Sequence, residues 1–161
     1  MSNKRRFIPK PRLSARQQRA HVMRVWPALD CRFEGGLLIV RGVVQPTPIT
    51  RDYRIRLTYK DYGVPKVYVD SPKLERRPQE PDTPIPHTYE YLTPGKERPC
   101  VYYPDSNEWN SSMLLATSVM PWLLSWLVDY ELWHATGAWL GGGVPHGSTK
   151  RDDRPPDKEA A

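Results

Sequence analysis

Cys100 and His87 are the residues whose types and spacing in this sequence suit covalent chemistry. A cysteine thiolate is a strong nucleophile, and the nearby cations Lys96 and Arg98 favour the thiolate form. His87 lies 13 residues before Cys100, on the far side of the Pro94–Gly95 pair, whose order is typical of a type II turn. Such a turn brings His87 beside the thiol, where its ring can donate a hydrogen bond to an oxyanion or carry a proton. A structural role, with His87 holding the loop through its backbone, stays open.

The segment around Cys100 is expected to be stiff, because Pro99 and Pro104 enclose the tyrosine-rich run 101–103. A nucleophile needs such a rigid mount, with one side of the thiol exposed. Cys31, the other cysteine, lies between a predicted helix and a predicted strand and is expected to be structural. Two cysteines give no disulfide framework, and the basic N-terminus lacks the apolar core of a secretory signal. A cytoplasmic protein with reduced thiols is therefore expected.

No metal site or cofactor is expected from the remaining residues. The histidines His21, His134 and His146 are far apart, and no CxxC or HExxH pattern accompanies them. The glycines at 141–143 follow a predicted helix and precede a Val-Pro pair, which is the wrong order for a phosphate-binding loop. A thiol hydrolase that pairs Cys100 with His87, His134 or His146 stays open as an alternative.

The basic charge is concentrated at the N-terminus. The chain has 161 residues, enough for one domain, and a formal net charge of +6. Its first 24 residues hold eight bases and no acid, whereas the rest carry 16 bases against 18 acids, a net charge of −2. We therefore expect a flexible basic arm over residues 1–13, a single domain over 14–146 and a disordered charged tail over 147–161. A small nucleic-acid-binding protein that uses the arm is an alternative, which the acidic balance of the domain disfavours.

A helix and an antiparallel meander are predicted first. Ser14 is typical of a helix cap and Pro27 of a helix end, and the expected apolar stripe consists of Val22, Met23, Trp26 and Leu29. Gly35–Gly36 open a strand over 37–44, and the strand over 53–60 alternates, with Tyr53, Ile55, Leu57 and Tyr59 on one face. After a turn at 61–63, a third strand covers 66–70. Residues 100–103 are either a fourth strand or an extended crossing segment, and the proline-rich residues 72–86 predict a stiff surface connector.

A long core helix is predicted after Trp109. Its apolar stripe consists of Leu115, Val119, Trp122, Trp126 and Trp133. Pro121 is expected to kink or split this helix, because proline removes one backbone hydrogen bond. The longest apolar run, residues 113–128, has 16 residues and is short for a membrane span, so a core helix is favoured and no membrane contact is expected.

The order of these elements resembles the α+β fold of the ubiquitin-conjugating enzymes. In that family the active cysteine follows a His-Pro-Asn element, and a tryptophan opens the helix behind it. Pro86-His87, Cys100-Val101 and Trp109-Asn110-Ser111 stand in the corresponding places of this sequence. The segments 86–90, 100–104, 108–110 and 133–139 resemble the bacterial stand-alone members encoded beside cGAS-like nucleotidyltransferases in CBASS antiphage operons. The family's oxyanion asparagine has no match, since His87 stands where it would be.

The resemblance implies carrier chemistry at Cys100, which would hold the C-terminal carboxyl group of a cGAS-like nucleotidyltransferase as a thioester and so prime cyclic-oligonucleotide signalling. His87 would then assist catalysis. The chain shows no adenylation domain, so either a separate activating enzyme is a further partner or the carboxyl group is activated by another route, whereas nucleic acid is not an expected partner. A non-catalytic binding scaffold of the same fold, with a structural Cys100, is the main alternative.

Overall fold

A computed structural model describes residues 8–90, 92–93 and 95–142 of the chain, and the predicted tail and His146 lie outside that range. Its first element, α1 (Ala15–Val25), begins where the sequence predicts. Ser14 and Gln17 bond each other's backbone N–H groups in a capping box. Ala15, Gln18 and Val22 form the buried face, so the expected stripe is partly wrong: Met23 is exposed, Trp26 caps the helix end, and Leu29 lies beyond it.

Four antiparallel strands form one sheet in the order β1 (Asp30–Glu34), β2 (Leu37–Val44), β3 (Tyr53–Tyr59) and β4 (Lys66–Ser71). The last three match the predicted meander. The fourth is β1 and not residues 100–103, which form neither helix nor strand. Gly35 and Gly36 join β1 to β2 with φ values of +56° and +78°, which suit a tight hairpin. The sequence does not predict β1, because this edge strand buries only Cys31 and so shows no alternating apolar pattern. The burial of Cys31 fits the expected structural role of its thiol.

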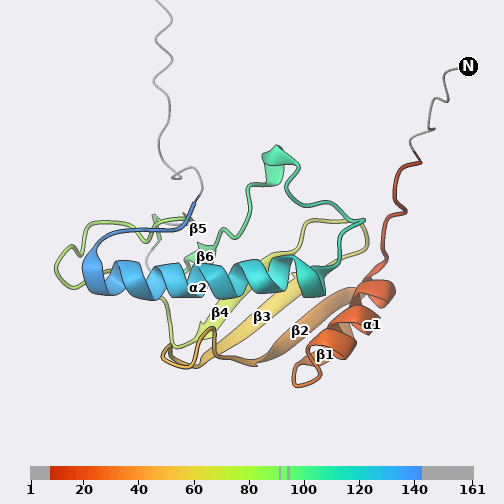
Figure 1. Cartoon of the computed structure of the whole chain (residues 1–161), viewed down its shortest axis with the longest axis horizontal. Helices are drawn as coiled ribbons and strands as arrows, with labels where there is room; N and C mark the ends of the chain where they lie inside the picture. Colours follow the sequence, from red (N-terminus) through yellow and green to blue (C-terminus); the bar gives the residue numbers. More distant parts are fainter. Residues whose placement is uncertain (1–7, 91, 94, 143–161) are drawn as a thin grey trace, which may run out of the picture.

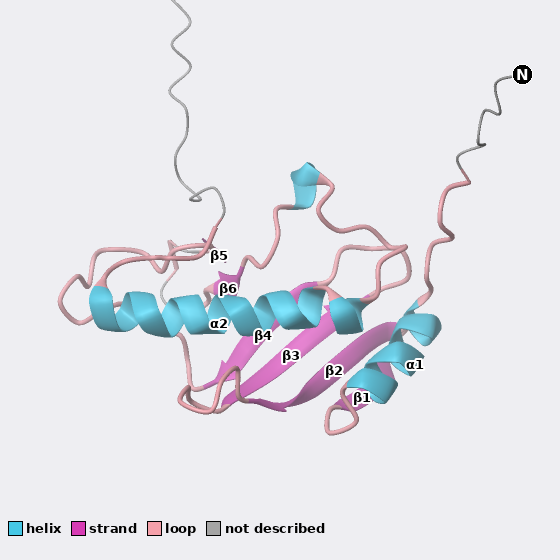
Figure 2. Ribbon diagram, viewed as in Figure 1, coloured by secondary structure: helices cyan, strands magenta, loops and turns pink. Residues whose placement is uncertain are grey.

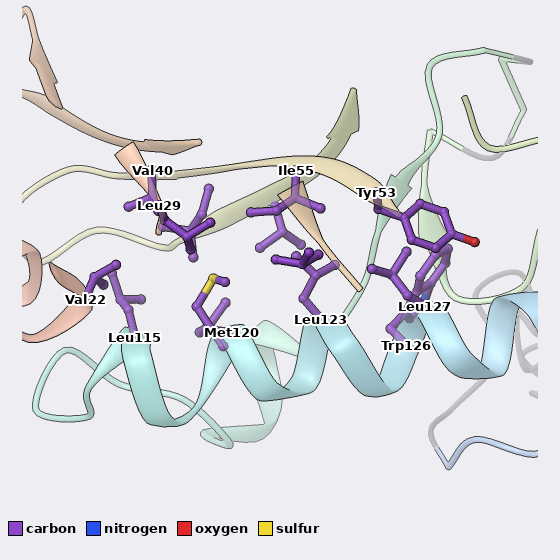
Figure 3. Packing of buried hydrophobic residues seen from close by; sticks show 14 of the residues in the cluster. Val22, Leu29, Val40, Tyr53, Ile55, Leu115, Met120, Leu123, Trp126 and Leu127 are labelled. Carbon is purple, nitrogen blue, oxygen red and sulfur yellow. The ribbon is translucent and has the colours of Figure 1, made fainter. Parts of the chain in front are cut away.

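β3 gives the sheet its buried face. As predicted, Tyr53, Ile55, Leu57 and Tyr59 are all fully buried, and they point to the face that α2 (Val119–Thr136) covers. Figure 1 shows α2 running along this face, with α1 packed at the β1 and β2 side. In the close view, Leu123 faces Ile55 and Leu127 faces Tyr53 (Figure 3). The α+β class and the order of helix, meander and core helix are therefore confirmed.

The start of α2 differs from the prediction. The helical pattern is divided at Ser118, between the short helix η2 (Leu115–Thr117) and α2, and not at Pro121. Pro121 lies in the first turn of α2, where a backbone N–H has no partner within the helix, so the proline costs no hydrogen bond. The first bond of the helix runs from the Trp122 N–H to the Ser118 carbonyl. Within the described residues, no helix combines the length and the apolar character that crossing a membrane requires.

The connector predicted over residues 72–86 contains neither helix nor strand, as expected, but it is not simply a surface segment. Leu74 and Ile85 are buried in the core. The Tyr130 hydroxyl of α2 accepts a hydrogen bond from the Glu75 N–H at 2.9 Å and donates one to the Glu75 carbonyl at 3.3 Å. The connector is thus fixed to the second half of α2, and it delivers the chain to His87 in a defined position.

The arm predicted for residues 1–13 meets the domain at its end. The Leu13 N–H donates to the Ser111 carbonyl at 2.6 Å, and the Arg12 guanidinium donates to the Ser111 hydroxyl at 2.8 Å. Arg12 also lies 4.7 Å from the centre of the Tyr62 ring. Residues 10–13 therefore run beside the loop that precedes η2.

Candidate functional site

A short β-ribbon carries the predicted site residues. β5 (Thr88–Tyr89) pairs with β6 (Arg98–Pro99) in antiparallel register, with Thr88 opposite Pro99 and Tyr89 opposite Arg98. Gly95 has a φ of +84°, which suits a turn at this end of the ribbon. Pro94, the other half of the predicted turn, lies outside the described residues. The sequence prediction that a turn returns Cys100 to His87 therefore agrees with the pairing of these strands.

His87 contacts Cys100 through its backbone. Its carbonyl oxygen accepts a hydrogen bond from the Cys100 N–H at 2.8 Å and a second one from the Trp126 indole N–H at 2.9 Å. His87 has a φ of +50°, in the left-handed region that few residues other than glycine and asparagine adopt easily. The backbone of the cysteine is thus tied to the core helix through one carbonyl group.

The imidazole ring of His87 lies against the C-terminal end of the fold. It packs on the Trp139 ring with centroids 5.0 Å apart and an interplanar angle of 31°. Burial raises the pKa of Asp129 on α2, and the charge of His87 opposes that shift, so the carboxylate and the imidazole interact. Neither Trp139 nor Asp129 was foreseen as a neighbour, since both lie more than 40 positions further along the chain.

Cys100 is enclosed, with 9% of its surface exposed. Its thiol donates to the Tyr102 carbonyl at 3.2 Å, and the Tyr89 side chain lies near enough to the sulfur to lower the pKa of the thiol. Burial raises the pKa of the Cys100 thiol, and it outweighs the lowering by Tyr89, by Arg98 and by the Tyr102 backbone. Of the two predicted cations, Arg98 favours the thiolate, but the expected exposure of the thiol is wrong, and burial favours its protonated form.

A row of alternating cations and tyrosines leads to Cys100 from the outer face of the sheet. The Arg56 guanidinium lies 4.0 Å from the Tyr68 ring centre, and Arg98 lies 5.7 Å from the same ring and 4.2 Å from the Tyr89 ring. The Asp70 carboxylate forms a salt bridge with the Arg56 guanidinium, with 3.2 Å between oxygen and nitrogen. A hollow of about 110 Å³ lies along this row and is lined in part by Tyr89 and Arg98.

An aromatic cluster holds the chain that follows Cys100. Trp109 is buried, and its ring meets Tyr59 edge to face with centroids 5.9 Å apart. Tyr102 packs between Trp109 and Trp122 and donates its hydroxyl proton to the Pro65 carbonyl at 3.3 Å. Trp109 does not open the core helix, which begins ten positions later. It lies in the loop between η1 (Pro104–Ser106) and η2. The chain around η1 extends away from the sheet, and η1 lies at its tip (Figure 2).

The other described histidines lie on separate elements. His21 is on α1, where its Nδ1 lies 3.0 Å from the Arg24 guanidinium. His134 is near the end of α2, with its ring against Tyr130 and Trp133. In the part of the chain that the structure describes, no three His, Cys, Asp or Glu side chains gather as metal ligands would.

The sequence reasoning missed Tyr89. The strand pairing explains why Tyr89 lies near Cys100. Residues 98 and 100 are two apart, so their side chains share a face of the ribbon, and Tyr89, which pairs with Arg98, can reach both. Counting back across the turn requires the length of the loop, which the sequence leaves open. Tyr89 is thus found only once the ribbon is paired.

Comparison with known proteins supports the resemblance noted in the sequence. A family model described as "Type II CBASS E2 protein" matches residues 18–147 of the chain. No curated protein matches it. The matched range contains the sheet, the β5–β6 ribbon, Cys100 and α2.

Proposed function

The chain belongs to the type II CBASS E2 family, and on this premise we propose that Cys100 forms a thioester with the C-terminal carboxyl group of a cGAS-like nucleotidyltransferase. The family works in CBASS antiphage signalling alongside such an enzyme. Holding the nucleotidyltransferase by its C-terminus would prime it for cyclic-oligonucleotide synthesis. The proposed activity is that of a conjugating-enzyme-like transferase with a covalent intermediate.

One observation carries the proposal. The Cys100 sulfur donates to the Tyr102 carbonyl and has the Tyr89 side chain nearby, while its backbone is tied to α2 through His87. Positioning of this kind fixes the reactive atom relative to an incoming carbonyl group. It also explains why a buried thiol is surrounded by polar groups, which a purely apolar core position does not need.

The proposed step is a thioester exchange. A separate activating enzyme supplies the acyl group as a thioester, because a free carboxylate is a poor electrophile. The Cys100 sulfur forms a bond to the carbonyl carbon, and the bond between that carbon and the donor's sulfur breaks with its electron pair leaving on the donor. The proton from the Cys100 thiol passes to the departing thiolate, so atoms and charge balance without an oxidant or a reductant.

The His87 ring is proposed to assist this step as a hydrogen-bond donor to the oxyanion or as a proton carrier. Asp129 supports either role, since its carboxylate favours a protonated imidazole. Packing on Trp139 restricts the orientation of the ring. The carbonyl of His87 is committed to Cys100 and Trp126, so the ring is the part of this residue that can act on the acyl group.

The test is adduct formation with a cGAS-like nucleotidyltransferase of the kind that type II CBASS systems contain. The two proteins and the activating components are mixed and separated on non-reducing gels, with and without hydroxylamine. We expect a hydroxylamine-labile adduct that is lost in Cys100→Ala and persists as a more stable ester in Cys100→Ser. Cys31→Ala is the matched control, because Cys31 is the other buried thiol and lies on β1. A labile adduct that survives Cys100→Ala contradicts the proposal.

The burial of Cys100 favours a second candidate, a binding scaffold in which this thiol is structural. That function predicts that Cys100→Ser leaves both binding of the nucleotidyltransferase and protection from phage intact. The proposed transferase predicts that protection is lost while binding is kept. A plaque assay combined with a pull-down distinguishes the two.

A further inference from the structure

Tyr89 is the side chain through which the ribbon reaches the reactive sulfur. In the antiparallel register Tyr89 lies opposite Arg98, and Cys100 follows two residues after Arg98, directly after the end of β6. Diagonal neighbours of this kind are about 7 Å apart or somewhat more at their backbones, within reach of a tyrosine but not of a shorter side chain. The ring of Tyr89 therefore extends across the ribbon toward Cys100, and the two side chains influence each other's pKa.

Arg98 fixes this ring in place. Because it lies directly across from Tyr89, its guanidinium stacks on the tyrosine ring at 4.2 Å from the centre. The Arg98 guanidinium also lies over the Tyr68 ring, and Arg56 contacts that same ring. Cation–π contacts of this kind favour one orientation of both partners. The row of residues on the outer face of the sheet thus ends at the sulfur.

We infer that the Tyr89 hydroxyl is a catalytic hydrogen-bond donor to the Cys100 sulfur, and that Arg98 is the residue that positions it. The inference rests on the proposed thioester function. A donor on the sulfur stabilises the thiolate when Cys100 attacks the acyl group and again when Cys100 leaves as the acyl group moves on. One contact therefore serves both the loading and the discharge of the carrier.

Tyr89 keeps its proton while it does so. Burial raises the pKa of the Tyr89 hydroxyl, and the hydrogen bond with Cys100 and the charge of the thiolate raise it further, whereas Arg98 lowers it. The phenol thus remains a donor over the neutral range, when the sulfur carries the negative charge.

Four groups set the charge balance at the sulfur. Tyr89 and Arg98 favour the thiolate, as does the Tyr102 backbone, and Glu108 disfavours it. The Glu108 carboxylate accepts the Tyr103 N–H at 3.0 Å, which keeps it within the loop that follows Cys100. Burial outweighs these contributions, so each favourable contact matters to the fraction of reactive thiolate.

The experiment measures alkylation of Cys100 by iodoacetamide as a function of pH, with the Cys100 peptide quantified by mass spectrometry. This reaction needs no partner protein and reports the thiolate directly. In Tyr89→Phe, which keeps the ring under Arg98, we expect the rate near neutral pH to fall about tenfold and the midpoint to rise, because a charge-assisted hydrogen bond is lost. Tyr68→Phe is the matched control, since it removes a hydroxyl from the same row and keeps the ring on which Arg56 and Arg98 stack; its profile should match the wild type.

Arg98 gives a second readout. Arg98→Gln should move the alkylation profile in the same direction as Tyr89→Phe, and Arg98→Lys should restore most of the rate because it restores the charge. An alkylation profile of Tyr89→Phe that coincides with that of the wild type overturns the inference. A wild-type alkylation rate in Arg98→Gln does the same. If the wild-type chain forms no adduct with the nucleotidyltransferase, the proposed function fails, while a shifted Tyr89→Phe profile still supports the contact with the sulfur. Circular dichroism of each variant confirms that the comparison is between folded proteins.

Discussion

Trp126 of the core helix and Cys100 of the loop donate to the same acceptor, the carbonyl oxygen of His87, at distances of 2.9 and 2.8 Å. The two donors lie 26 positions apart in the sequence. A single carbonyl group therefore connects the proposed nucleophile to the core helix. Its orientation depends on the left-handed backbone of His87, which makes this position sensitive to substitution.

Trp126→Phe should loosen this connection without emptying the core. Phenylalanine keeps an aromatic ring beside Tyr130 but lacks the indole N–H that His87 accepts. Trp109→Phe is the matched control, because the Trp109 indole N–H is buried without a hydrogen-bond partner among the described residues. We expect Trp126→Phe to lower the free energy of unfolding by about 1 kcal/mol more than Trp109→Phe does, since only the former loses a hydrogen bond.

Urea denaturation of both variants measures this difference. Alkylation of Cys100 gives a second measurement, because a freer His87 carbonyl should change the position of the cysteine. Equal destabilisation by the two substitutions would show that the indole bond contributes nothing.

Substitutions of His87 should separate its backbone role from its ring. Asparagine adopts left-handed backbone conformations readily, whereas a β-branched residue at a φ of +50° is strained. We expect His87→Asn to stay within about 0.5 kcal/mol of the wild type and His87→Val to be destabilised by about 1–3 kcal/mol. Thermal unfolding checks the order of the three proteins, and similar stability of the two variants would contradict it.

The same pair of variants bears on the proposed chemistry. The asparagine side chain in His87→Asn retains a hydrogen-bond donor but has no proton to shuttle. If the ring acts as an oxyanion donor, His87→Asn keeps much of the rate of adduct formation. If it acts as a proton carrier, the variant loses most of that rate and its dependence on pH near the imidazole pKa.

The parts of the fold that the sequence predicts well are those with a strong local pattern. The alternation from Tyr53 to Tyr59 identifies a strand with one buried face, and that face is fully buried. Ser14 identifies the start of α1 because capping is a local interaction. β1 has no such pattern, since an edge strand with one buried cysteine reads as a polar connection.

The site is only partly predictable for a related reason. Proximity of His87 and Cys100 follows from one turn, which is local in sequence. The burial of Cys100 and the contact between His87 and Trp139 depend on how distant segments pack, and no spacing in the chain encodes them. Tyr89 falls between these cases, because its contact with Cys100 follows from strand register alone.

A buried tyrosine of the sheet should control stability at high pH. The Tyr53 hydroxyl donates to the Glu131 carboxylate at 2.7 Å, and Tyr53 is fully buried. Burial, the hydrogen bond to Glu131 and the charge of Glu131 all raise the pKa of Tyr53 above its ordinary value. The folded protein therefore keeps a proton that the unfolded chain releases above about pH 10, so stability is lost as pH rises through that value.

The loss of stability caused by Tyr53→Phe should shrink as pH rises. Below about pH 10 the variant lacks the bond to Glu131 and should be less stable than the wild type by about 1 kcal/mol. Above that pH the wild type loses about 1.4 kcal/mol per pH unit through Tyr53, and phenylalanine has no proton to release. The two curves of unfolding free energy should converge near pH 11, as measured by urea denaturation at several pH values. Other buried tyrosines, such as Tyr130, titrate in both proteins and cancel in the difference. Curves that stay parallel would show that Tyr53 ionises as easily in the folded protein as in the unfolded chain.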